Sequence, residues 1–321
     1  MTAIGGFFGM EPGREDHGPW HTNASALTSG RACFRAVLEM TRPARVLVPF
    51  YICDAALVPL KRLGIPFEFY GVTRSLDPLP AEWPSDASVL YANYFDLKAC
   101  GADTIAGALA GRAIVDDTQA FFRRGHGSAW SFNSARKFFG VPDGAYLYGP
   151  RAADVHPARA NEGAPAEHLR TTAAGGRQLA YRQYVEAESR VSDEVLAPSS
   201  LTRRTLNAVA YEEAKTARRR NFGALHARLG AVNTLQLPMT LDAGAVPFCY
   251  PFLPARGDLH ERLWRQEIFV PRLWPEVIAR ESPGFEWERE LAKRLLPLPV
   301  DHRYTPDAMT RVGDAVIEGA A

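Results

Sequence analysis

The chain has 321 residues, of which 46% are hydrophobic and 23% are charged, and its formal net charge is +1 at pH 7. This length and composition are typical of a globular protein that buries a large core and divides into two domains. The balanced charge argues against nucleic-acid binding and membrane-surface binding. Because no segment approaches ~18 consecutive apolar residues and the N-terminus lacks a leader pattern, we expect a cytoplasmic protein.

The cysteines and lysines indicate which kinds of site the chain can contain. No CxxC pair or neighbouring histidine pair accompanies the four cysteines, so we expect neither a metal site nor a disulfide framework. Lysine is uncommon, since only five of the 37 basic residues are lysines. The cysteines, expected as free thiols, are Cys33, Cys53, Cys100 and Cys249.

The first half of the chain alternates between short β-branched or aromatic segments and segments with helical periodicity. The first helix follows a polar, Gly-rich lead-in and a Ser-Gly start. Strands separated by helices favour a mostly parallel sheet that is covered on both faces. The sequence predicts helices over residues 31–40, 53–64 and 105–111 and strands over residues 45–50, 67–72, 88–95 and 113–117.

The second half has a different pattern. Residues 164–229 are helical and charged and are interrupted at residues 198–200. Short strands and covering helices follow, which is typical of a small α+β domain. The pattern therefore predicts the α/β class, with a large domain over residues 1–200, built on a mostly parallel sheet covered by helices, and a small C-terminal α+β domain over residues 201–321.

Polar side chains follow the predicted strand at residues 113–117. Asp116 and Gln119 come at the carboxyl end of this strand, where parallel α/β sheets bind their ligands. A carboxylate at this position can keep a pyridine nitrogen protonated and so make a pyridine ring a better electron sink. The alternative is that Asp116 only caps the next turn.

One lysine has sequence neighbours that favour a reactive amine. Lys137 stands between a hydroxyl-rich segment and an aromatic pair, just before the turn Pro-Asp-Gly. Apolar and aromatic neighbours favour the neutral amine that forms an imine with an aldehyde. The alternative is a surface lysine beside Arg136.

A phosphate site is predicted at the start of the first helix. Ser29 and Gly30 precede the helix, where backbone N–H groups and the helix dipole favour an anion, and the Arg31 guanidinium adds further donors. The alternative is a simple helix cap. Tyr51, after the strand at residues 45–50, could stack on a flat cofactor ring or belong to the core.

Four segments together resemble the DegT/DnrJ/StrS family of sugar aminotransferases. Gly144 follows Lys137 by seven residues, as in that family's SF-x-x-x-K block, and residues 245–275 and 295–316 resemble its small-domain ending. The resemblance implies a pyridoxal 5′-phosphate (PLP) enzyme of fold type I, the aspartate aminotransferase fold, in which the sheet of the large domain is of the seven-stranded type. The four segments are TSGRACFRAVLEM, RVLVPFYICDAALVPLKRLGIPFEFYGV, IVDDTQAFF and WSFNSARKFFGVPDGAYLYG.

The resemblance also implies roles for single residues. It identifies Lys137 as the amine that binds PLP covalently and moves the substrate proton, Asp116 as the partner of the pyridine nitrogen, and Gln119 as the group near the phenolic oxygen. Tyr51 would stack on the ring. The phosphate would be held by Ser29, Gly30, Arg31 and one of Ser131, Asn133 or Ser134.

Three features depart from the family pattern. The interval from Ser131 to Lys137 is one residue longer, which leaves the phosphate contact open among Ser131, Asn133 and Ser134. Arg31 replaces a small hydroxyl residue. The Gly-x-Asn-x-Arg segment that a neighbouring subunit contributes in the family has no match in residues 187–204.

These inferences lead to one functional prediction. The resemblance implies a homodimeric aminotransferase of amino sugar biosynthesis that moves an amino group from glutamate to a keto-sugar, with a nucleotide-linked sugar as the expected acceptor. The alternative is a non-catalytic or regulatory protein that keeps the fold and binds cofactor or sugar without amino transfer, which the missing Asn/Arg segment motivates.

Overall fold

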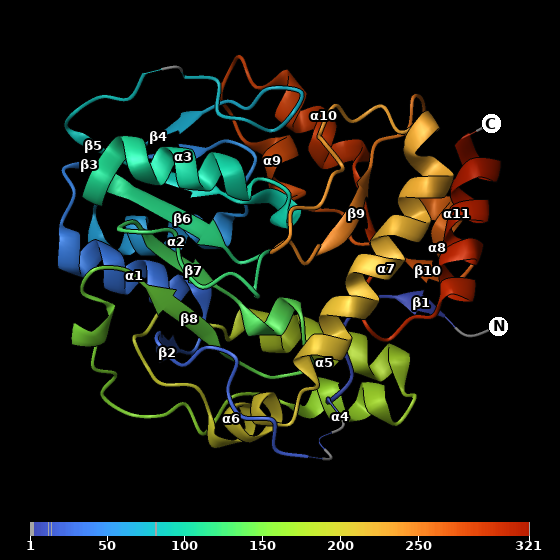
Figure 1. The fold of residues 1–321 in the computed structure, drawn as a ribbon, viewed down its shortest axis with the longest axis horizontal. Helices are drawn as coiled ribbons and strands as arrows, with labels where there is room; N and C mark the ends of the chain where they lie inside the picture. The colour runs from blue at the N-terminus through green and yellow to red at the C-terminus, as the bar shows by residue number, and fades with distance from the viewer. Residues whose placement is uncertain (1–2, 12, 14, 81, 321) are drawn as a thin grey trace.

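The protein is described from a computed structural model, which covers residues 3–11, 13, 15–80 and 82–320. A seven-stranded sheet forms the centre of one part of the molecule, and the C-terminal elements lie beside it (Figure 1). No helix of the described residues is long and apolar enough to cross a membrane.

The strand order of the central sheet is β2-β8-β7-β6-β5-β3-β4. Strands β3 to β7 run parallel to one another, and β8 pairs antiparallel with both β7 and β2. This confirms the predicted α/β class and the mostly parallel sheet. The strands are β2 (Ser25–Leu27), β3 (Arg45–Pro49), β4 (Phe67–Tyr70), β5 (Ala87–Ala92), β6 (Ala113–Asp117), β7 (Trp130–Asn133) and β8 (Ala145–Tyr148).

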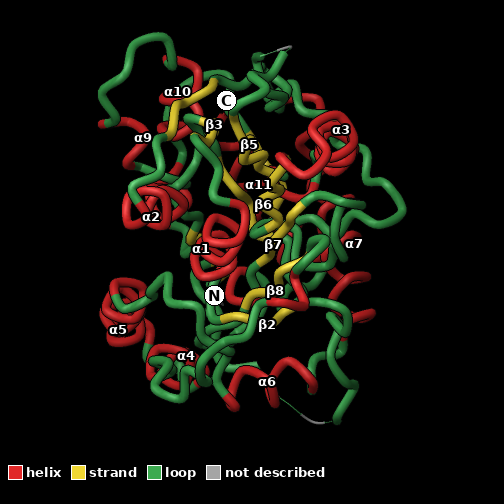
Figure 2. The backbone as a smooth tube through the Cα atoms, turned by 90° about the vertical axis from the view of Figure 1, so that its left-hand side faces the viewer, coloured by secondary structure: helices red, strands yellow, loops and turns green. Residues whose placement is uncertain are grey.

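Helices cover both faces of this sheet, with α1 and α2 on one face and α3 on the other (Figure 2). Successive side chains of a strand point to opposite faces. In β6, Ile114 therefore packs in the core on the α1 face and Val115 in the core on the α3 face. The helices are α1 (Gly30–Thr41), α2 (Asp54–Leu63) and α3 (Ala99–Leu109).

Four helices follow the sheet. The predicted helical stretch divides into α4, α5, α6 and the long α7, and an irregular segment precedes α6 where Pro198 interrupts the pattern. The side chains of Phe222, Leu225 and Leu229 on α7 pack into the C-terminal core. The bounds are α4 (Glu167–Ala173), α5 (Arg177–Ser189), α6 (Ser200–Asn207) and α7 (Tyr211–Leu229).

In the described residues, the C-terminal part contains two small sheets and four helices besides α7. Strand β1, from the start of the chain, pairs with β10, so Ile4 packs in the C-terminal core. The domain boundary at residue 200 stays a prediction. The elements are β1 (Ile4–Gly5), β9 (Cys249–Phe252), β10 (Ile268–Phe269), β11 (Leu296–Pro299), α8 (His260–Arg265), α9 (Glu276–Ala279), α10 (Glu286–Arg294) and α11 (Pro306–Ala320).

Candidate active site

A cavity of about 790 Å³ lies against the α1 face, where the carboxyl ends of the parallel strands meet the first turn of α1. Six of the ten candidate site residues line it. The same edge of an open α/β sheet is where such folds bind ligands. The six residues are Ser29, Gly30, Arg31, Asp116, Ser134 and Lys137.

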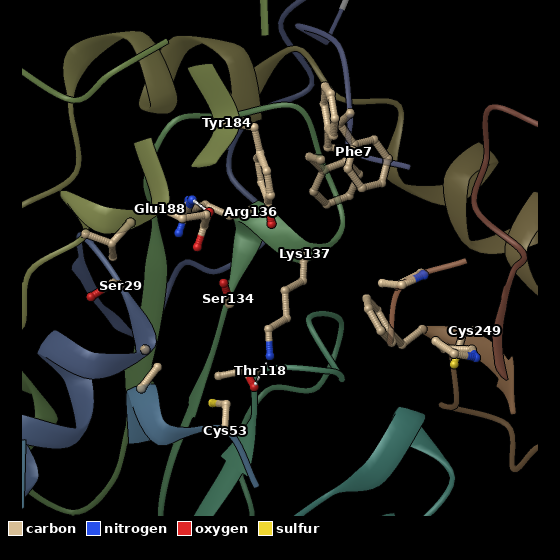
Figure 3. Close-up of a pocket in the computed structure, with 18 of the residues that line it drawn as sticks. Phe7, Ser29, Cys53, Thr118, Ser134, Arg136, Lys137, Tyr184, Glu188 and Cys249 are labelled. Carbon is tan, nitrogen blue, oxygen red and sulfur yellow. Dashed lines mark hydrogen bonds and ion pairs between the residues drawn. The ribbon is translucent and has the colours of Figure 1, made fainter. Parts of the chain in front are cut away.

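Lys137 and Asp116 are connected through a residue that the sequence analysis overlooked. The Lys137 Nζ donates to Thr118 Oγ1 at 2.8 Å, and the Thr118 N–H donates to Asp116 Oδ1 at 2.8 Å. Lys137 ends a short 3₁₀ turn, Ala135–Lys137, that directly follows β7. Figure 3 shows its side chain extending through the cavity toward Thr118.

Asp116 is buried at the end of β6, only 9% exposed. Burial raises the pKa of its carboxyl, and the nearby Lys137 ammonium opposes that shift. A buried carboxylate is stabilised by a cationic partner. The geometry therefore offers an acid that a bound cationic ring nitrogen would keep ionised.

The start of α1 forms one wall of the cavity. Ser29 is the N-cap, since its side chain accepts from the Ala32 N–H at 3.1 Å, and its hydroxyl also donates to the Ser192 carbonyl at 3.0 Å. A Cβ at Gly30 would lie 2.9 Å from Thr118 Cγ2, so a larger residue would crowd this wall. The Arg31 Nη1 donates to the Val191 carbonyl at 2.6 Å.

Ser134 lines the cavity, whereas Ser131 and Asn133 do not. Ser131 is buried on β7 with no hydrogen-bond partner for its hydroxyl among the described residues. The Asn133 side chain is occupied by structural contacts: it accepts from the Tyr146 N–H at 3.1 Å and contacts His21 Nε2 at 3.2 Å. Of the three residues left open, Ser134 is the one that reaches the cavity.

Tyr51 and Gln119 also lie away from the cavity wall. Tyr51 is fully buried, and its ring packs edge-on against Trp274 with 4.6 Å between centroids. The Gln119 Oε1 accepts from the Phe95 N–H at 3.0 Å. Both side chains serve packing or loop geometry in this structure.

Other lining residues come from distant parts of the chain (Figure 3). Cys53 is the N-cap residue of α2 and lies near Lys137 and Asp116. Burial raises the pKa of its thiol, the charge of Lys137 opposes this shift, and the charge of Asp116 adds to it. The rings of Phe7 and Tyr184 stack with centroids 5.1 Å apart. Among the described residues, no group of three or more His, Cys, Asp or Glu could hold a metal ion.

The residues of this cavity fit PLP in their chemistry. Lys137 supplies an amine and Asp116 a buried carboxylate. The first turn of α1 and Arg31 offer donors for a phosphate. Gly30 keeps the wall next to Thr118 free of a side chain. These are the groups that a pyridine aldehyde with a phosphate arm requires.

No protein-family model matches this chain, and no curated protein does either. Solved structures with similar folds include the sugar aminotransferase CalS13 from Micromonospora echinospora, with 14% identity, a TM-score of 0.63, and coverage of 92% of this chain and 87% of that chain. For DesI, solved in the presence of its TDP-sugar product, the identity is 16% and the TM-score is 0.63, and the alignment covers 94% of this chain and 81% of that chain.

A third similar structure is Spr1654 from Streptococcus pneumoniae, a putative sugar aminotransferase in its PMP form. Its identity is 9%, its TM-score 0.66, and the alignment covers 97% of this chain and 92% of that chain. At these identities the likeness concerns the fold, which the three proteins share with this chain over nearly its whole length. The chain therefore has the fold of the PLP-dependent sugar aminotransferases.

Proposed function

We propose that the chain is a PLP-dependent aminotransferase that moves an amino group from glutamate to a keto-sugar. The observation that carries the proposal is the chain of contacts from Lys137 Nζ through Thr118 to the buried Asp116 in a cavity at the sheet edge. PLP, when bound, supplies the aldehyde that captures amines and the ring that stabilises a carbanion.

Each residue then has a definite task. Lys137 would hold the aldehyde carbon of PLP, and its amine, when free, would carry the substrate proton. The Asp116 carboxylate would favour the protonated form of the ring nitrogen. The first turn of α1, Arg31 and Ser134 would hold the phosphate. The Thr118 hydroxyl holds the lysine amine close to the reacting atoms.

The acceptor class is part of the same proposal. CalS13 and DesI are, by their descriptions, a sugar aminotransferase and a protein that forms a TDP-sugar product. The cavity is large enough for a ligand beyond PLP, and the Phe7–Tyr184 stack offers flat apolar surface at its rim. We therefore propose a keto-sugar linked to a nucleotide, acted on in the cytoplasm.

A homodimer is proposed for this enzyme as well. Three large apolar side chains of α5 are about half exposed: Leu179 is 49% exposed, Tyr181 60% and Val185 51%. Apolar side chains gathered on one helix are typical of a covered surface. Light scattering of the purified protein measures the dimer, and L179E with V185E should shift it to monomer.

The experiment that tests the function is a spectroscopic half-reaction. Purified protein is incubated with PLP, and the visible absorption band of the captured aldehyde is recorded before and after glutamate is added. Loss of the band with release of 2-oxoglutarate supports amino transfer. A stable band that glutamate does not change favours a non-catalytic protein that binds the cofactor. A protein that stays colourless contradicts the PLP assignment and leaves only the alternative that binds sugar.

A further inference from the structure

An ion pair in the cavity wall has no part in the function proposed above. Arg136 precedes Lys137 on the 3₁₀ turn after β7, and its Nη2 donates to Glu188 Oε1 near the end of α5. Both residues line the cavity (Figure 3), and their side chains are 15% and 35% exposed.

A second guanidinium lies close to this pair. Arg31, at the start of α1, is near enough to Glu188 and Arg136 that the charges of both act on it. Ser134, two residues before Arg136, and Gly30 line the same region. The Asp193 carboxylate also acts on Arg31, but it is paired with Arg35 and Arg62. Arg31, Arg136 and Glu188, beside the start of α1, therefore carry a net positive charge together.

This combination of donors matches a phosphate better than it matches a carboxylate. Guanidinium groups bind phosphate oxygens with two parallel N–H donors, and backbone N–H groups at a helix start add more. A phosphate also carries up to two negative charges, which match the two positive charges of Arg31 and Arg136. Because Glu188 is one-third exposed, its side chain can turn toward water without breaking a packed core.

We propose that Arg136 binds the phosphate of the ligand that Lys137 captures, and that Glu188 is an internal anion which this phosphate displaces. The inference rests on the proposed function. It adds a phosphate-binding arginine directly next to the reactive lysine, and it makes Glu188 a competitor that sets the affinity for phosphorylated ligands.

The test compares PLP with pyridoxal, which has the same aldehyde and ring but no phosphate. Each is titrated into the intact protein, and the dissociation constant is taken from the visible band. Arg136→Gln should weaken PLP binding by about 10- to 100-fold and leave pyridoxal nearly unchanged. Glu188→Gln should tighten PLP binding by about five-fold, again without an effect on pyridoxal.

A matched pair of controls lies on the same helix. Glu186 and Arg190 form an exposed i,i+4 ion pair on and next to α5, with side chains 61% and 62% exposed, and neither lines this cavity. Glu186→Gln and Arg190→Gln should change neither dissociation constant. Circular dichroism and melting curves of every variant establish that the fold is retained.

The outcomes separate this inference from the function on which it rests. If the wild-type protein captures neither aldehyde, both the phosphate assignment and the proposed function are wrong. A protein that captures both aldehydes, with the same ratio of dissociation constants in the wild type, R136Q and E188Q, overturns only the phosphate assignment. The assignment also fails if R136Q leaves PLP binding unchanged and weakens only the binding of glutamate.

Discussion

The two faces of the sheet differ sharply at the end of β6. On the α3 face, Asp117 Oδ2 bonds to His126 Nε2 at 2.8 Å, His126 Nδ1 bonds to Asp103 at 2.7 Å, and Asn93 donates to Asp117 Oδ1 at 2.8 Å. On the cavity face, Asp116 and Lys137 meet only through Thr118.

This difference has a physical meaning. Buried polar groups that are fully hydrogen-bonded make a structure rigid, whereas groups with spare bonding capacity at a cavity can bind a ligand. Two consecutive aspartates thus serve different purposes because strand geometry turns them to opposite faces. On the closed face, the network of Asp117, His126, Asp103 and Asn93 holds the strand end in place. The open face, with Asp116, Thr118 and Lys137, is where we propose that the chemistry takes place.

The largest expected effect comes from the open face. Asp116→Asn should lower amino transfer by about 10²- to 10³-fold, the range for removing one preorganised electrostatic group. The melting temperature should change little, because a neutral amide of the same shape avoids the cost of a buried charge. Steady-state kinetics and thermal melting measure the two effects. A strong loss of stability would show that Asp116 is structural.

The equivalent substitution on the closed face should have the opposite effects, because it should lower stability and leave PLP binding intact. Asp117→Asn removes one partner of a buried ion pair and should lower the free energy of unfolding by about 3 kcal/mol. The PLP absorption band should remain. Urea denaturation and absorption spectroscopy check both, and unchanged stability would contradict a rigid closed face.

The closed face should also respond to pH. Its two carboxylates overcome the effect of burial and raise the pKa of His126 to about 9. A histidine whose pKa is higher in the folded state stabilises the protein fully below its unfolded pKa of ~6.5. That contribution, on the order of 3 kcal/mol, should disappear as pH rises from ~6.5 to ~9.

His126→Gln provides the comparison for this effect. Burial also raises the pKa of Asp96, to about 7, so the wild-type stability contains a second pH-dependent contribution of the same sign. The difference between wild type and H126Q isolates the histidine. Equal slopes of unfolding free energy against pH in the two proteins would rule out a charged His126.

The smallest effect is expected at Thr118, which connects the acid and the lysine. Thr118→Val keeps the shape and removes the hydroxyl that Lys137 contacts, so we expect amino transfer to fall by about 10-fold, as for one lost hydrogen bond. Thr118→Ser should recover most of the activity. If valine and serine give the same rate, the hydroxyl does not position the amine.

Local sequence patterns predicted much of this molecule. Helix starts and β-branched runs located α1, α2, β3 and β6 closely, because each pattern reflects burial on one face of an element. Among the short strands expected in the C-terminal part, β10 is limited to Ile268–Phe269. The short β2, within the polar lead-in, carried no comparable signal.

The site was less predictable, for a clear reason. Asp116 lies at the end of β6 and Lys137 shortly after β7, at the edge where strand ends meet, so their positions in the sequence predict that both lie near a ligand cavity. Tyr51 and Gln119 also follow strands, but their side chains turn away from the cavity, a choice that depends on loop geometry. Glu188 and Phe7 reach the cavity from distant segments, which no local pattern reveals.

The proposed function depends on Lys137 as the amine that captures PLP. Of the five lysines in the chain, it is the one that lines the cavity of the described structure. Protein incubated with PLP is reduced with borohydride, digested and analysed by mass spectrometry. We expect a pyridoxyl group on Lys137 and none in Lys137→Ala. An unlabelled Lys137, or a label that K137A retains on another lysine, would contradict this assignment.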